Sequence, residues 1–193
     1  MKLLAQSALG AAFGASQPVS GFESHGAVLR ERADIGSVML TTSVEPGSIA
    51  EAAGNVAGVE IPRVPGPLKT APGRWGLWLQ PRTWLIRCGV EEEWDLVKRL
   101  NAAFPDRRAH AVAFTDAICW FELSGAVAHD ILTEGGFISL ERGGLPIGNA
   151  KRTLIAQVAA IVVREAENAW LVAVERSRAN YFAQWLSAAA KGR

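Results

Sequence analysis

The sequence has almost no net charge and contains no long apolar run. Lys and Arg together number 20 against 19 for Asp and Glu, which leaves a net charge of +1. So small a charge supplies no long-range field that would attract nucleic acid or an anionic membrane surface. No apolar stretch reaches the roughly 18 residues that a membrane-spanning helix needs, so we expect no membrane insertion.

Cysteine is also scarce, and this bears on the compartment. Cys88 and Cys119 lie in apolar stretches without Cys-x-x-Cys spacing. This pattern is typical of reduced core thiols in a cytoplasmic protein, which is the location we expect. Residues 1–16 carry a single Lys, and polar residues interrupt their apolar run. They favour a docking arm or short helix, with a cleaved signal peptide as the alternative.

The sequence contains only weak matches to motifs for catalysis or cofactor binding. His25, His110 and His129 stand apart, and no Gly-x-Ser-x-Gly elbow accompanies them. The adjacent glutamates 91–93 point in different directions and are typical of a solvated helix start, not a metal-ligand set. The glycines at 143–148 lack the Gly-Lys-Ser/Thr order and precede a predicted strand, whereas a phosphate-binding loop precedes a helix. We therefore expect no catalytic, metal-binding or cofactor-binding residue on this chain.

The residues that are present describe a globular chain. It has 193 residues, of which 49% are hydrophobic and 20% charged, enough to bury a core without disulfides. Residues 1–24 are rich in Ala, Gly and Ser and predict an N-terminal arm, and residues 25–193 predict a single domain. Seven tryptophans accompany one tyrosine. Large amphipathic aromatics are common in cores and interfaces, so this excess is a first indication of a binding partner.

Hydrophobic periodicity predicts alternating hairpins and helices. Strands are expected at 36–44, 74–88 (a hairpin), 109–123 (a hairpin turning at Thr115–Asp116), 152–164 and 169–174. Helices are expected at 48–57, at 91–104, after an N-cap at Ser124, and after a cap at Ser177. Pro-rich residues 59–73 and residues 141–150 are expected to be connections. This order predicts an α+β fold with mainly antiparallel sheets, each covered by helices on one face.

Residues 62–84, which are Pro-rich and then Trp-rich, are also the candidate partner interface. Trp75 and Trp78 have opposite parity along one strand, so they cannot both face the core. Aromatic and Arg side chains usually dominate binding at interfaces. We therefore predict that Arg74, Trp78 and Arg82, together with the N-terminal arm, contact a larger partner.

Several blocks of the sequence resemble the γ subunit of heterotetrameric sarcosine oxidase. They occur in the family's order and cover most of the chain from about residue 28 to residue 189. The blocks are VLRER at 28–32, GSVML at 36–40, GLWLQPRTWLI at 76–86, Thr115–Asp116 followed by FELSGAVAHDIL at 121–132, GNAKRTLIAQV at 148–158 and VERS at 174–177.

This resemblance implies a fold similar to the folate-binding domain of the glycine cleavage T protein. It implies a structural, non-catalytic subunit of a cytoplasmic complex, with α, β and δ subunits as partners. That complex would convert sarcosine, or a related N-methyl amino acid, to glycine, methylene-tetrahydrofolate and hydrogen peroxide. FAD, FMN, NAD, tetrahydrofolate and zinc are then expected on the partner chains and none on this one.

An independent tetrahydrofolate-binding or aminomethyl-transfer module is the alternative function. Such a module needs a carboxylate at the floor of a pterin pocket. Asp116 is the nearest candidate for that carboxylate, and a simple turn residue is the competing interpretation.

Overall fold

The computed structural model describes residues 7–9, 21–24, 26–136 and 145–192. Contacts between Cα atoms divide the chain into two compact units, each with its own sheet and hydrophobic core. Unit 2 comprises residues 34–116 and 149–151, and unit 1 comprises the rest. The single domain expected from residue 25 onward therefore contains two units. The chain leaves the six-stranded sheet after strand β2 (Ala27–Glu31) and returns to it at strand β8 (Ile118–Ser124).

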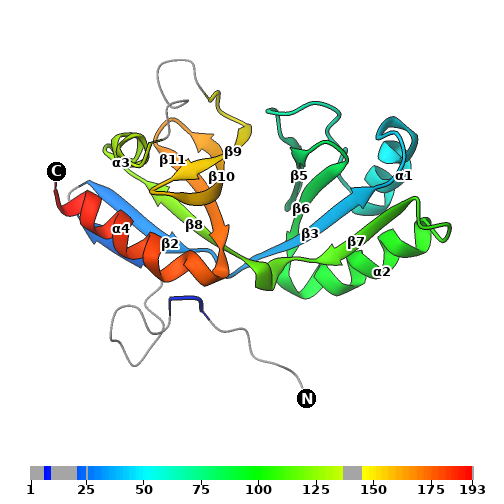
Figure 1. Cartoon of the computed structure of the whole chain (residues 1–193), viewed down its shortest axis with the longest axis horizontal. Coiled ribbons are helices and arrows are strands. Elements are labelled where there is room, and N and C mark those ends of the chain that lie inside the picture. Colours follow the sequence, from blue (N-terminus) through cyan, green and yellow to red (C-terminus); the bar gives the residue numbers. More distant parts are fainter. Residues whose placement is uncertain (1–6, 10–20, 25, 137–144, 193) are drawn as a thin grey trace. The chain divides into compact units, whose positions relative to one another are not determined.

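Unit 2 is built on a five-stranded antiparallel sheet in the order β4-β5-β6-β3-β7. Helices α1 and α2 cover one face of this sheet (Figure 1). The elements are β3 (Ile35–Thr42), α1 (Gly47–Ala57), β4 (Lys69–Ala71), β5 (Arg74–Gln80), β6 (Thr83–Gly89), α2 (Glu93–Ala103) and β7 (Ala109–Ala113). The expected hairpin at 74–88 and the helices at 48–57 and 91–104 are confirmed within a few residues.

Period-two alternation explains how β6 meets the helices. Trp84, Ile86 and Cys88 point into the core beneath α1 and α2, and Trp84 has no exposed surface. The indole N–H of Trp84 donates a 2.8 Å hydrogen bond to the carbonyl of Pro62. Burying a large aromatic side chain contributes roughly 2–3 kcal/mol, provided that its polar N–H finds a partner. The Pro-rich connection is thereby held against the core.

Unit 1 contains a six-stranded sheet in the order β1-β2-β8-β11-β10-β9. Helices α3 and α4 share a core with one face of it, where the rings of Phe121 and Phe182 lie 5.9 Å apart. The elements are β1 (Gly21–Ser24), β2 (Ala27–Glu31), β8 (Ile118–Ser124), α3 (Ala128–Glu134), β9 (Asn149–Ile155), β10 (Val158–Ala166), β11 (Ala169–Glu175) and α4 (Ala179–Lys191). The expected α+β fold with antiparallel sheets is confirmed.

The N-terminal arm is partly integrated into unit 1. β1 falls inside the expected arm and pairs with β2, so the boundary expected after residue 24 lies within a hairpin. Leu9 is only 1% exposed and belongs to the unit 1 core. The Glu31 carboxylate accepts hydrogen bonds from the Ala8 N–H, at 2.8 Å, and from the Ser7 hydroxyl. Residues 7–9 therefore pack on their own chain.

The hairpin expected at 109–123 is wrong. β7 pairs with β3 in the five-stranded sheet, whereas β8 pairs with β2 and β11 in the six-stranded sheet. A 3₁₀ turn at Thr115–Ala117 joins them. Tight hairpin turns favour residues that accept positive φ, and Thr115–Asp116 adopts no such geometry. The two strands consequently serve different sheets.

The long strand expected at 152–164 is also wrong, because it contains a turn. Ala156 and Gln157 have φ values of 49° and 65°, which fit a two-residue type I′ turn between β9 and β10. Asn-Gly is the usual sequence at such a turn, so Ala-Gln gave no local indication of one. Ser124 is likewise not a helix cap: it ends β8, opposite Ala169 of β11, and α3 begins four residues later.

Candidate functional site

Both thiols are buried, and their pKa values are raised. Cys88 is 2% exposed, and burial, reinforced by the nearby Glu93 carboxylate, raises its pKa to about 11. Burial, with the charge and hydrogen bonding of Glu31, also raises the pKa of Cys119. A neutral buried thiol is a weak nucleophile and a poor metal ligand. Both cysteines therefore act as core residues.

The histidines have ordinary surroundings where the structure describes them. His110 is exposed on β7 in unit 2. His129, on α3 in unit 1, places its Nδ1 3.4 Å from a carboxylate oxygen of Asp130, and both side chains are partly exposed. His25 lies outside the described residues. Across the described ranges no three His, Cys, Asp or Glu side chains gather as a metal-ligand group.

Two further sequence candidates are the glycines at 143–148 and Asp116. Gly143 and Gly144 lie outside the described residues, and Gly148 leads directly into strand β9. Asp116 is an exposed residue of the 3₁₀ turn. None of the helices within the described ranges has the length and apolar character needed to cross a bilayer.

All three predicted interface residues take part in the fold of unit 2. The Arg74 guanidinium donates to the Ala57 carbonyl at 2.6 Å and pairs with Glu92 at 3.2 Å. Arg82, at φ 66°, occupies the turn between β5 and β6 and donates to the Ser43 carbonyl at 3.3 Å.

Trp78 is half-buried, with its ring edge-on to Trp84 at 5.9 Å. Trp75 lies on the other face, as its parity predicts, and is also buried. The role of Arg74, Trp78 and Arg82 in partner binding stays a prediction.

Sequence reasoning missed the most exposed tryptophan. Trp94 on α2 is 65% exposed, whereas Trp84, Trp120 and Trp170 are almost fully buried. Its position could have been found, because Leu96, Val97 and Leu100 form the buried stripe of this helix and Trp94 falls outside it. The high tryptophan content therefore serves the two cores more than the surface.

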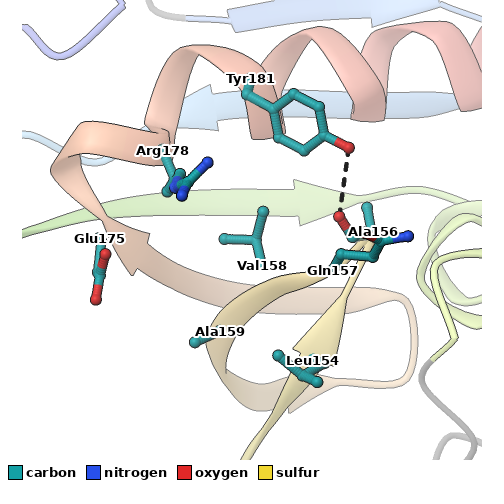
Figure 2. Close-up of a pocket in the computed structure, with 8 residues that line it drawn as sticks. All are labelled: Leu154, Ala156, Gln157, Val158, Ala159, Glu175, Arg178 and Tyr181. Carbon is teal, nitrogen blue, oxygen red and sulfur yellow. Dashed lines mark hydrogen bonds between the residues drawn. The ribbon is translucent and has the colours of Figure 1, made fainter.

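Sequence reasoning also missed a surface groove of about 560 Å³ on unit 1. It lies between the β9–β10 turn and the start of α4, and Figure 2 shows Tyr181 above that turn. The Tyr181 hydroxyl reaches the Ala156 carbonyl at 3.4 Å. The lining residues are Leu154, Ala156, Gln157, Val158, Ala159, Glu175, Arg178 and Tyr181.

This groove combines exposed apolar groups with charged ones. Leu154 is 61% exposed and Tyr181 is 52% exposed. The side chains of Arg178 and Glu175 lie in the same groove (Figure 2), and among the described residues neither makes a hydrogen bond or ion pair. Such a surface is suited to binding another molecule through shape, apolar contact and charge.

Comparison with known structures shows which proteins have a similar fold. A chain of the heterotetrameric sarcosine oxidase from Corynebacterium sp. U-96, in complex with pyrrole 2-carboxylate, is 22% identical with a TM-score of 0.79. The alignment covers 96% of this chain and 90% of that one. The glycine cleavage system aminomethyltransferase T from Bartonella henselae is 12% identical with a TM-score of 0.61, covering 84% of this chain and 46% of that one. No curated protein matches significantly by sequence.

The fold is thus an α+β module of the kind found in these two proteins. The family described as "Sarcosine oxidase, gamma subunit family" matches residues 43–192. The chain belongs to this family, which makes it one subunit of a sarcosine oxidase.

Proposed function

We propose that this chain is a structural, non-catalytic subunit of a sarcosine-oxidase-type complex. The complex would oxidatively demethylate sarcosine, or a related N-methyl amino acid, in the presence of tetrahydrofolate and oxygen. Its products would be glycine, methylene-tetrahydrofolate and hydrogen peroxide. Family membership over residues 43–192 is the observation that carries the proposal.

Catalysis belongs in this proposal to the α, β and δ partner subunits, which would carry FAD, FMN, NAD, tetrahydrofolate and zinc. The surroundings of this chain's own reactive groups support that division. Both thiols are buried with raised pKa values, and His129 faces an adjacent carboxylate at the surface. The free thiols also support a cytoplasmic location.

Purification from the native source tests the assignment. A tagged full-length chain should retain the other oxidase subunits, and the complex should consume oxygen when sarcosine is added. The same chain purified alone should be colourless, without flavin absorbance or oxidase activity. A tagged chain that retains no other subunit, or that oxidises sarcosine alone, would contradict the proposal.

Folate binding separates this proposal from the independent module. Titration calorimetry of the isolated chain with tetrahydrofolate should show no saturable binding. Saturable micromolar binding that is lost in Asp116→Asn would favour a tetrahydrofolate-binding or aminomethyl-transfer module instead.

A further inference from the structure

We propose that the groove between the β9–β10 turn and the start of α4 is the docking site for a segment of another subunit. The segment would carry an apolar side chain between a carboxylate and a hydrogen-bond donor. This inference rests on the proposed function, since it assigns a surface to the subunit contact that the function requires.

Two exposed apolar side chains lie on opposite sides of the groove. Leu154 comes from β9 and Tyr181 from α4, and each keeps more than half of its surface in water. Burying such side chains contributes about 25 cal/mol for each Å² removed from water. Tyrosine is also enriched among the residues that contribute most binding energy, because its ring buries area while its hydroxyl keeps a polar partner.

The two charged residues beside these side chains indicate which chemical groups the docked segment would carry. Arg178 and Glu175 line the groove without an ion pair among the described residues. Arg178 occupies the N-cap position of α4, where a cation gains nothing from the helix dipole. Both residues are exposed, so a carboxylate opposite Arg178 and a donor opposite Glu175 would replace their contacts with water by paired ones. A segment of mixed charge therefore fits better than a uniformly apolar one.

The turn that forms one wall of the groove is strained. Ala156 and Gln157 both have positive φ, which is unfavourable by about 1–2 kcal/mol for a residue other than glycine. Strain retained where Gly would relieve it often marks a functional surface. Here the turn keeps the Gln157 side chain at the groove and directs the Ala156 carbonyl toward Tyr181 (Figure 2).

Paired surface variants of the tagged full-length chain test the site. Arg178→Glu and Leu154→Asp should each lower the partner subunits retained by about tenfold or more. The matched controls in unit 2 are Lys98→Glu, also an exposed cation, and Ala102→Asp, which adds the same carboxylate at an exposed position of α2. The controls should retain partners like the parent. Circular dichroism and thermal melting should show that all four variants fold.

Arg178→Lys tests the predicted carboxylate directly. It keeps the positive charge, so partner retention should stay close to that of the parent. Its amine can form an amide with a carboxylate when a carbodiimide is added to the purified complex. Mass spectrometry should then find residue 178 joined to an Asp or Glu of another subunit.

The possible results distinguish a failure of the proposed docking site from a failure of the proposed function. If the parent retains partners and Arg178→Glu or Leu154→Asp retains them equally, the groove is not the docking site and the proposed function stands. Equal losses in the unit 2 controls would also overturn the assignment. A cross-link only to a second copy would make the groove a self-association surface. A parent that retains no oxidase subunit would overturn the function and the docking site together.

Discussion

The carboxylate of Glu93 accepts a 2.6 Å hydrogen bond from the hydroxyl of Thr115. The same carboxylate oxygen accepts the backbone N–H groups of Phe114 and Thr115, both at 2.8 Å, although Glu93 is only 6% exposed. The Thr115 hydroxyl in turn accepts the N–H of buried Ser37 at 2.9 Å. This network ties the residues that follow β7 to the start of α2 and to β3.

Removing either partner of this network should destabilise the fold. Glu93→Gln and Thr115→Val should each lower the free energy of unfolding by about 1–3 kcal/mol, because buried donors lose a charged or hydroxyl acceptor. The double variant should lose less than the sum, since both changes remove the same hydrogen bond. Urea unfolding followed by circular dichroism measures this. Strictly additive losses would show that the two side chains are not coupled.

Trp78 and Trp94 should differ in their contribution to stability. Trp78→Ala should lower unfolding free energy by about 1–3 kcal/mol, because the ring packs on the unit 2 core and against Trp84. Trp94→Ala should change it by less than about 0.5 kcal/mol, since most of that ring is exposed. Thermal and urea unfolding of the two variants provide the comparison. A stable Trp78→Ala variant with weakened assembly would support the prediction that Trp78 is an interface residue.

Leu9 should stabilise unit 1 although it lies near the N-terminus. Leu9→Ala should lower the free energy of unfolding by about 2 kcal/mol or more, because the side chain is buried in the core. Leu154→Ala is the matched control at a 61% exposed position and should be nearly neutral. Urea unfolding of both variants measures the two changes in unfolding free energy. Equal effects would mean that Leu9 does not pack as described.

Relief of the turn at Ala156 should stabilise the protein. Glycine adopts positive φ without a Cβ penalty, so Ala156→Gly should raise the free energy of unfolding by about 0.5–1 kcal/mol. Ala159→Gly on β10, where no positive φ occurs, should instead lower it. Differential scanning calorimetry of the two variants checks the opposite signs. A lower melting temperature for Ala156→Gly would contradict the turn geometry.

Alkaline pH should destabilise the chain partly through Cys88. Its folded pKa of about 11 lies above the ordinary thiol pKa of 9.0, so between these pH values the unfolded thiol ionises while the folded one stays protonated. Unfolding then releases protons, and stability falls as pH rises from about 9 to 11. Cys88→Ala should show a shallower decline in urea midpoint over this range than the parent does. If the urea midpoint of both proteins declines equally with pH, Cys88 does not contribute to the loss of stability.

Local patterns were sufficient for much of unit 2 and for the final helix. The apolar stripe of α2 and the alternation in the hairpin at 74–88 are short-range features. The connection expected at 59–73 instead contains strand β4, which pairs with β5. The candidate groove could not be found in this way. Its lining residues come from β9, β10, the turn between them, the end of β11, the 3₁₀ turn at Arg176–Arg178 and α4. The turn that joins β9 to β10 carries no glycine.

The sequence by itself determined the α+β class, most helices and the family, because periodicity and ordered sequence blocks are properties of neighbouring residues. The caps expected at Ser124 and Ser177 are both wrong, since α3 and α4 begin without a side-chain cap. Only the tertiary structure decided that β7 and β8 belong to different sheets and that Leu9 is a core residue. It also decided that Trp94, Leu154 and Tyr181 stay exposed. The reason is physical: strand pairing and burial depend on contacts between segments far apart in the chain, and an apolar residue has the same local pattern whether it is covered or not.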